Sequence, residues 1–427
     1  MDHASLPPLR VREPGGPPFL PRVVEARLAA AAAAMPVVVI MGARQVGKST
    51  LARLHAGTAG HRYLTLDDAG VRAAARTDPI GLLRSSPRLI LDEVQRDPAL
   101  LLALKQVVDD DAFAGHREPG RFIVTGSADL LAMREVADSL AGRAVYVPLR
   151  PMTRRELLGR GAAGQWSRYL EAPRDAWPEL TRTDDAPPAP WQDAVRRGGF
   201  PVPALDLPDD ATRTTWYRGW LDTFLDRDVR DLGGVTDALE LRQLMRVVAL
   251  RQGQLVNRAD LARDAGIAPT TAWRWLALLE RAFQFVRLEA YAVNRTKRLI
   301  KAPKAYWCDP ALAHVLAGMP TPDGSAFEGL VLADLLAWAD ADARGAQIMH
   351  WRTASQQEVD FVVERADGRL LGIECKTTTR PSTKDAAGLR AFLAEYPHAA
   401  GGLVLHAGEH VVWLADGVLG VPWWRVL

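Results

Sequence analysis

The sequence predicts an α/β protein whose N-terminal part contains a parallel β-sheet, and three observations lead to this prediction. The chain has 427 residues, more than a single hydrophobic core usually serves, so we expect about two to three domains. Short apolar runs at 37–41, 89–91 and 122–124 are typical of strands buried on both faces. Helical patterns lie between these runs, and strands that alternate with helices form a parallel sheet covered on both sides.

The composition excludes several classes of protein. Hydrophobic residues make up 48% and charged residues 24% of the chain, which is typical of a globular protein and not of a disordered, collagen-like or coiled-coil chain. The net charge is +2, so any signal for nucleic acid must be local. Two cysteines, Cys308 and Cys375, exclude a disulfide framework and a Cys-rich zinc module. We find neither a secretion signal nor a membrane span in the sequence, and expect a cytoplasmic protein.

A phosphate-binding loop follows the first apolar run. The segment after this run matches G-x-x-x-x-G-K-[ST] and consists of Gly42, Ala43, Arg44, Gln45, Val46, Gly47, Lys48 and Ser49. Glycines allow the backbone N–H groups to surround phosphates, the lysine reaches the β- and γ-phosphates, and the serine hydroxyl binds Mg²⁺. Together with Thr50, these residues form the predicted ATP site.

Polar residues also follow the other apolar runs. Asp92 and Glu93 come directly after the second run, and we expect Asp92 to bind Mg²⁺ and Glu93 to be the base that activates water. After the third run, either Ser127 or Thr125 is suited to position that water, or the segment is only a small-residue turn. Arg143 precedes a fourth apolar run at 144–147 and is either an arginine finger for a neighbouring subunit or a surface arginine. A finger would make the protein a homo-oligomer.

Residues 257–280 have the pattern of a helix-turn-helix, and the strand-like stretch 283–292 would form a wing. Between residues 271 and 304 there are eight Lys and Arg against two Glu, a local net charge of +6. Such a basic stripe favours nucleic acid as a partner, whereas a lid or a protein contact is the alternative. The residues that we predict to contact nucleic acid are Arg274, Arg295, Lys297 and Arg298.

A second set of acidic residues lies near the C-terminus. Asp360 stands in a predicted strand at 358–363, and Glu374 and Lys376 share one face of another at 371–376. Glu328 comes from a predicted helix. The three carboxylates could bind Mg²⁺ or Mn²⁺ while Lys376 assists attack on a phosphodiester. The alternatives are a solvated strand face with a salt bridge, and a nuclease-like fold that does not cut.

Taken together, these motifs resemble one family, the prokaryotic AAA-type ATP-binding proteins that carry a C-terminal domain of unknown function, DUF4143. Further matching segments are Leu-Asp-Glu-Val-Gln at 91–95, Leu-Ala-Gly-Arg at 140–143, Gly-Gly-Phe-Pro at 198–201 and Arg-Asp-Val at 227–229. The resemblance extends from about Arg22 to Trp423. It implies an ATPase whose C-terminal part is similar to the PD-(D/E)xK, or restriction-endonuclease-like, fold. It also implies that Asp360, Glu374 and Lys376 are that fold's active-site residues, joined by Glu328.

The predicted organisation has five parts. They are an arm at 1–21, an AAA-type P-loop ATPase domain at 22–152, a helical lid and linker at 153–240, a winged helix at 241–310 and a nuclease-like domain at 311–427. The predicted function is a Mg²⁺-dependent ATPase that engages nucleic acid, with DNA favoured, and whose nuclease-like domain cuts under ATP control. The alternative is an ATP-dependent switch or scaffold in signalling or defence, with an inactive nuclease-like domain that binds protein partners.

Overall fold

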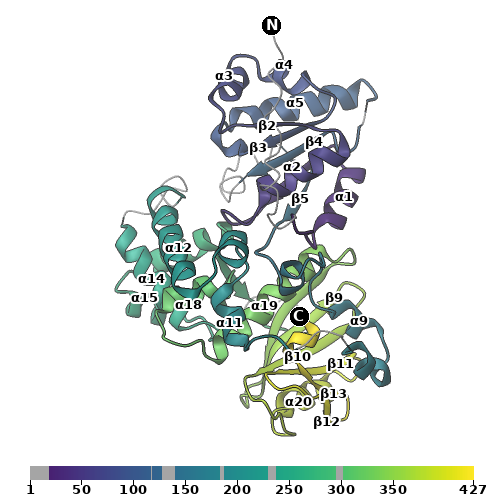
Figure 1. Cartoon of the computed structure of the whole chain (residues 1–427), viewed down its shortest axis with the longest axis vertical. Coiled ribbons are helices and arrows are strands. Elements are labelled where there is room, and N and C mark those ends of the chain that lie inside the picture. The colour runs from purple at the N-terminus through teal and green to yellow at the C-terminus, as the bar shows by residue number, and fades with distance from the viewer. Residues whose placement is uncertain (1–18, 117, 127–139, 183–186, 229–236, 295–301) are drawn as a thin grey trace.

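The computed structural model describes residues 19–116, 118–126, 140–182, 187–228, 237–294 and 302–427. Figure 1 shows three parts: the N-terminal sheet with its helices in purple and blue, a group of teal helices, and a green-to-yellow sheet that contains the C-terminus. Ser127, Arg295, Lys297 and Arg298 lie outside the described residues, as does most of the predicted arm.

The first sheet has five strands in the order β2-β3-β4-β1-β5, and all neighbours are parallel. In chain order the strands are β1 (Val37–Met41), β2 (Arg62–Thr65), β3 (Leu89–Asp92), β4 (Phe122–Gly126) and β5 (Ala144–Pro148). All five residues of β1 are buried, and Val38 and Ile40 join one hydrophobic cluster while Val37 and Val39 join another. The predicted strands and the parallel sheet are confirmed.

Helices cover both faces of this sheet. They are α1 (Glu25–Ala34), α2 (Lys48–Ala59), α3 (Ala69–Thr77), α4 (Pro79–Arg84), the 3₁₀ turn η1 (Val94–Arg96) and α5 (Ala99–Phe113). Local sequence sets several of their ends, since Asp68 and Asp78 accept hydrogen bonds from the first turns of α3 and α4, and Pro79 is the first residue of α4. Helix α5 buries an apolar face that includes Leu100 and Leu104.

Short helices follow β5, because prolines and glycines prevent longer ones. They are α8 (Arg154–Leu157), α9 (Trp166–Glu171), η2 (Arg174–Ala176), α10 (Trp177–Leu180) and α11 (Trp191–Arg197). Trp166, Trp177 and Trp191 are buried in the same hydrophobic cluster as Phe327 and Phe361 of the C-terminal part. Much of the segment predicted as lid and linker therefore packs on the C-terminal sheet, and α9 lies beside that sheet in Figure 1.

The middle of the chain is mainly helical and also contains a pair of short antiparallel strands, β6 and β7. Its elements are η3 (Val202–Asp206), α12 (Asp210–Thr223), η4 (Phe224–Asp228), α14 (Ala238–Leu250), α15 (Arg258–Ala265), α16 (Pro269–Arg281), β6 (Phe285–Leu288), β7 (Lys304–Trp307) and α18 (Pro310–Ala317). Gly266 ends α15 with φ 69°, in the left-handed region that glycine tolerates. The predicted pair of helices around this glycine is confirmed, and Leu261 and Trp275 are buried as expected.

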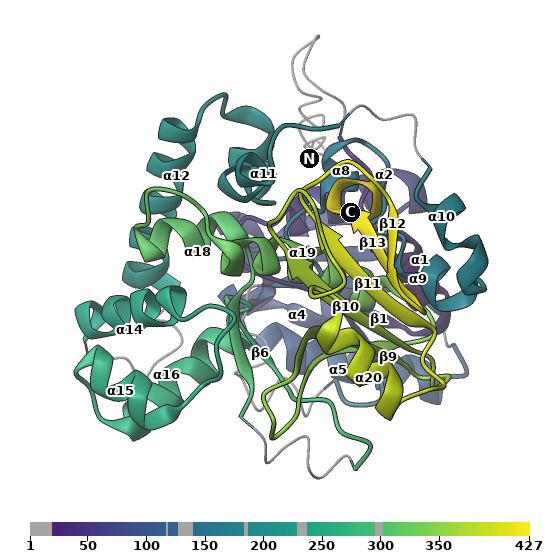
Figure 2. The same ribbon diagram turned by 90° about the horizontal axis from the view of Figure 1, so that it is seen from below.

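The C-terminal sheet is mixed and has six strands in the order β12-β13-β11-β10-β9-β8. Its elements are α19 (Gly324–Ala341), β8 (Ala346–Arg352), β9 (Glu358–Arg365), β10 (Leu370–Lys376), α20 (Ala387–Glu395), β11 (Gly401–His406), β12 (Val412–Ala415), β13 (Val418–Pro422) and α21 (Trp423–Val426). The two strands predicted here, now β9 and β10, are antiparallel neighbours. Helix α20 packs on one face, while α19 and the tryptophan-bearing segment pack on the other; Figure 2 shows α19 and α20 beside β10.

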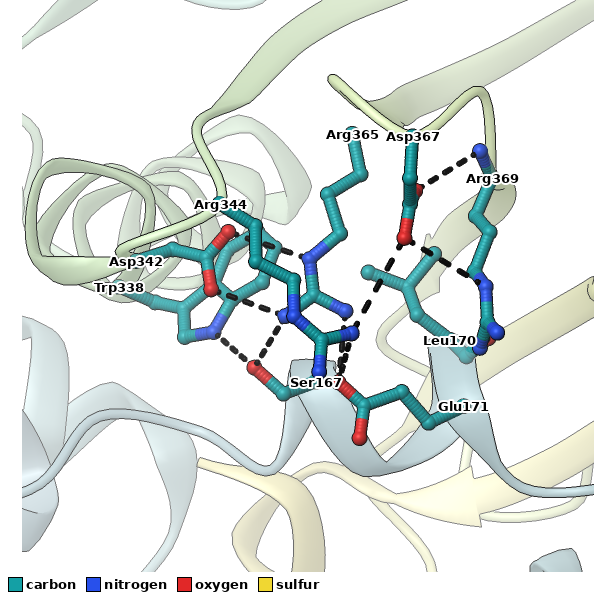
Figure 3. Close-up of polar contacts among 9 residues, drawn as sticks. All are labelled: Ser167, Leu170, Glu171, Trp338, Asp342, Arg344, Arg365, Asp367 and Arg369. Atoms are coloured by element: carbon teal, nitrogen blue, oxygen red, sulfur yellow. Dashed lines mark hydrogen bonds and ion pairs between the residues drawn. The ribbon is translucent and has the colours of Figure 1, made fainter.

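A network of charged residues fastens α9 to the C-terminal sheet (Figure 3). The guanidinium group of Arg365, at the end of β9, donates hydrogen bonds to Asp342 at 2.9 Å and to Glu171 of α9 at 2.7 Å. Trp338 of α19 donates to the hydroxyl of Ser167 in α9 at 2.9 Å. The docking of α9 therefore combines buried tryptophans with an ion-paired edge.

Within the described ranges, no helix has both the length and the apolar character needed to cross a membrane.

Candidate nucleotide site and acidic cluster

The loop Gly42–Ser49 connects β1 to α2, as the motif predicts. Gly42 has φ 156° and Gly47 has φ 100°, both in the region that favours glycine. A Cβ atom on Gly42 would lie 2.2 Å from the carbonyl oxygen of Leu149, which directly follows β5. The close approach of this backbone therefore also requires glycine at position 42. Lys48, buried in the first turn of α2, donates to the carbonyl oxygens of Gly42 and Ala43 at 3.1 and 2.9 Å.

The remaining predicted loop residues are also placed around this turn. Val46 is buried, and Gln45 is exposed with φ 63°. Arg44 is half-buried within the loop, and Thr50 is exposed in the first turn of α2. The turn precedes the N-terminus of α2, where free backbone N–H groups attract phosphate. The residue types and the position of the helix therefore fit a nucleoside triphosphate.

Asp92 is a meeting point of several side chains at the carboxyl end of the sheet. It is buried, accepts a hydrogen bond from the hydroxyl of Ser49 at 3.0 Å and another from Tyr63 at 2.5 Å, and contacts the hydroxyl of Thr125. A carboxylate and a serine hydroxyl beside the loop are hard oxygen ligands that suit Mg²⁺. Ser49 and Asp92 are thus together, as the sequence predicts.

Glu93 has an unusual backbone conformation. Its φ is 58°, in the left-handed region that glutamate rarely adopts, and such strain is often found at functional sites. Its backbone N–H donates to Thr125 at 3.3 Å, and the amide of Gln95 contacts its carboxylate. Of the two hydroxyl residues left open by the sequence, Thr125 contacts both Asp92 and Glu93.

Tyr63 and Arg22 also belong to this site, although the sequence analysis did not single them out. Burial and the neighbouring carboxylate of Asp92 raise the pKa of Tyr63, so its hydroxyl keeps its proton and donates. Arg22 is buried and donates to the carbonyl oxygen of Val46 in the loop at 3.0 Å. Its other nitrogens bond Glu156 at 3.0 Å and the carbonyl oxygen of Arg150 at 2.7 Å. No local pattern reveals these contacts, because the partners are far apart in the sequence.

Arg143 lies at the amino-terminal end of the parallel strands, opposite to the end that carries the phosphate-binding loop. Its carbonyl accepts from the N–H of Val37 at the start of β1, whereas the phosphate-binding loop follows the end of β1. Its guanidinium forms a two-pronged ion pair with Asp109 at 2.5 and 2.8 Å. Within one chain it is therefore not near the loop, and only a neighbouring subunit's site could receive it.

Three of the predicted C-terminal residues, Asp360, Glu374 and Lys376, are neighbours on β9 and β10. The backbone N–H of Cys375 donates to Asp360 at 2.9 Å, the N–H of Asp360 donates to Glu374 at 3.4 Å, and Lys376 donates to Glu374 at 2.7 Å. Burial and the charge of Asp360 raise the pKa of both Glu374 and Glu328. Asp360 therefore raises the pKa of both glutamates, although Lys376 and Lys304 compensate part of the negative charge.

Two residues of β7 complete this cluster, and the sequence analysis did not single them out for it. Lys304 contacts Glu358 and lies 3.4 Å from Asp360, and Tyr306 donates to Glu328 at 2.7 Å. The chemistry of the carboxylates fits Mg²⁺ or Mn²⁺, because they are hard oxygen donors whose raised pKa values would fall beside a cation. Among the described residues, however, no three His, Cys, Asp or Glu side chains already converge as a metal cage.

Of the predicted nucleic-acid residues, the structure describes Arg274, which is exposed on α16. Two other arginines of this region are packed against an aromatic ring. Arg258 and Arg287 lie 3.7 and 4.7 Å from the ring centre of Trp273, also on α16.

Comparison with known proteins places the chain in a family. It is 32% identical over 410 residues to the uncharacterized proteins Rv2008c of Mycobacterium tuberculosis and Mb2031c of Mycobacterium bovis, a match that covers 94% of this chain and 83% of each relative. The chain belongs to their family. Residues 34–158 match an AAA domain, 189–323 a domain of unknown function (DUF8612) and 323–426 a domain of unknown function (DUF4143).

The AAA match and the parallel sheet together identify an α/β P-loop ATPase fold in the N-terminal part of this family member. Among solved structures, the Walker-type ATPase paby2304 of Pyrococcus abyssi is 17% identical, with a TM-score of 0.39. That likeness covers 68% of this chain and 93% of the archaeal chain.

Proposed function

We propose that this protein is a Mg²⁺-dependent ATP hydrolase. The observation that supports this most strongly is the hydrogen bond between Ser49 and buried Asp92, with Glu93 directly after it. Lys48 and the loop N–H groups would bind the phosphates, and Mg²⁺ bound by Ser49 and Asp92 would neutralise their charge. Glu93 would accept the proton of the attacking water, with Thr125 fixing the backbone beside it.

Two variants test this proposal. Lys48→Ala should weaken ATP binding, while Glu93→Gln should bind ATP normally and hydrolyse it about 10²–10⁴-fold more slowly. Binding is measured with a fluorescent ATP analogue and hydrolysis by phosphate release. Glu118→Gln is the matched control, because the side chain of Glu118 is 46% exposed and the ion pair that it forms within the described residues is with Arg88. Hydrolysis by Glu93→Gln at the wild-type rate would show that another group is the base.

We further propose that the middle region binds nucleic acid through a winged helix made of α15, α16 and the β6–β7 pair, with α16 facing the nucleic acid. The exposed side chain of Arg274 and the local charge of +6 support this assignment. Replacing Arg295, Lys297 and Arg298 with Ala should weaken binding of a DNA duplex and flatten its salt dependence. Unchanged affinity and slope would instead favour a protein partner.

For the C-terminal part we propose a restriction-endonuclease-like domain whose site is formed by Glu328, Asp360, Glu374 and Lys376. The carboxylates would bind Mg²⁺ or Mn²⁺, which stabilises negative charge at a phosphodiester, and Lys376 would assist. Asp360→Ala should abolish metal-dependent cleavage of DNA or RNA and leave ATP hydrolysis nearly intact. If the wild type cuts no nucleic acid with either metal, the protein is better described as an ATP-dependent switch or scaffold.

A further inference from the structure

We propose that Lys304 is a positioning residue of the acidic cluster. Its ammonium group occupies the place beside Asp360 that a divalent cation would take, and links that place to the β6–β7 pair of the middle region. This inference rests on the proposal above that the cluster binds a metal.

The contacts of Lys304 show an internal counter-ion. Its side chain is only 3% exposed, and its ammonium contacts Glu358 and lies 3.4 Å from Asp360. Lysine is almost never buried unless its charge is paired. The side chain is therefore held among the carboxylates by charge, and the carboxylates are in turn compensated by it.

The strand that carries Lys304 reaches two sides of the cluster. Lys304 and Tyr306 are two residues apart on β7, so they point to the same face. Lys304 meets Asp360 of β9, and Tyr306 donates to Glu328 of α19. One strand from outside the C-terminal sheet thus forms a wall of the acidic cluster.

The backbone of Lys304 is held by the middle region. It pairs with Leu288 of β6 and forms a β-bridge with Leu255. The carbonyl oxygen of the preceding residue, Pro303, accepts a hydrogen bond from the N–H of Val256 at 2.7 Å. A shift of the β6–β7 pair would therefore move the ammonium group relative to Asp360.

Electrostatics gives this arrangement a consequence. An ammonium group and a divalent cation that bind the same carboxylate lie within about 5 Å of each other and repel strongly in a buried site. Lys376 also pairs with a carboxylate of the cluster, but its side chain is 36% exposed and solvent screens its charge, whereas that of Lys304 is 3% exposed. Metal binding at Asp360 therefore favours a retreat of Lys304, and a retreat of Lys304 with its strand favours metal binding. The position of the β6–β7 pair and the metal affinity of the cluster are linked in both directions.

The test uses the full-length protein with Lys304→Met, which keeps the length of the side chain and removes its charge. Mn²⁺ affinity is measured by calorimetry, and thermal unfolding is followed in EDTA and in Mn²⁺. We expect Lys304→Met to bind Mn²⁺ at least about tenfold more tightly than the wild type. We also expect its Tm to lie below that of the wild type in EDTA and to be restored by Mn²⁺. Lys304→Gln, which keeps hydrogen-bond donors, should behave in the same way if the Met variant does not fold.

Arg352→Met is the matched control, because Arg352 pairs with Glu358 at 3.6 Å but is 34% exposed. Its Mn²⁺ affinity should stay within about twofold of the wild type. Wild-type Mn²⁺ affinity in both Lys304 variants, or a lowered Tm that Mn²⁺ does not restore, would overturn the inference and leave Lys304 a structural residue. Absence of Mn²⁺ binding in the wild type and every variant would instead overturn the proposed metal site itself.

Discussion

The replacement Arg365→Met tests how α9 is fastened to the C-terminal sheet. The side chains of Arg365 and Asp342 are only 3% and 7% exposed, so removal of the guanidinium leaves a buried carboxylate without its partner. Loss of one member of a buried ion pair costs about 3–5 kcal/mol. Glu171 is 41% exposed and adds at most about 1 kcal/mol. Because methionine fills most of the space, we expect a loss of about 3 kcal/mol in the free energy of unfolding.

Urea unfolding followed by tryptophan fluorescence measures this loss, since Trp166 of α9 is buried next to the network. The control is Arg182→Met, whose pair with Glu179 is 78% and 61% exposed and should change stability by less than about 1 kcal/mol. Asp342→Asn in the Arg365→Met background should recover part of the loss, because the unpaired charge is removed. An equal effect of Arg365→Met and Arg182→Met would refute the reasoning.

Three further predictions concern the two sites and assembly. Thr125→Val should lower kcat for ATP hydrolysis about 10–100-fold and change ATP affinity little, because the hydroxyl contacts Asp92 and the N–H of Glu93; an unchanged kcat in steady-state assays would contradict its role. Without divalent metal, the free energy of unfolding should fall as the pH rises from 4.5 to about 8, because the pKa of Glu374 is raised from 4.5 to about 8 in the folded state. In this range the folded state holds a proton that the unfolded state has lost. Glu374→Gln should make this slope shallower in denaturation measured across pH, while Glu328, whose pKa is also raised, keeps part of it; a flat wild-type profile would count against the prediction. Arg143→Ala should bind ATP without hydrolysing it, and mixing it with Glu93→Gln protein should partly restore activity if the arginine acts on a neighbouring subunit; no recovery at any mixing ratio would exclude a shared site.

The nucleotide site was largely predictable from the sequence because its residues follow strand ends. Parallel strands place their carboxyl ends at one edge of a sheet, so a motif after β1 and a carboxylate at the end of β3 lie at the same edge. Ser49 and Asp92 meet for this reason. The same reasoning places Thr125, near the carboxyl end of β4, beside Asp92.

Contacts between distant segments could not be predicted in this way. The pair of Arg22 and Glu156 joins residues 134 positions apart, and Lys304 and Asp360 are 56 apart. Neither pair has a local pattern that selects its partner. The segment at 160–195 resembled a linker because prolines and glycines interrupt its helices, but burial of Trp166 and Trp177 is a tertiary effect that overrides such local signals.

The packing of Trp166, Trp177 and Trp191 against the C-terminal sheet has a consequence for how the chain folds during synthesis. These tryptophans leave the ribosome well before the strands that cover them, β9, β10, β11 and β13, have been made. Large apolar surfaces then stay exposed until synthesis is nearly finished, which invites chaperone binding. A fragment that starts at residue 311 would expose the opposite surface, around Phe327 and Phe361, and would also lack Lys304. The hydrophobic cluster around these tryptophans is therefore completed late, from segments translated at very different times.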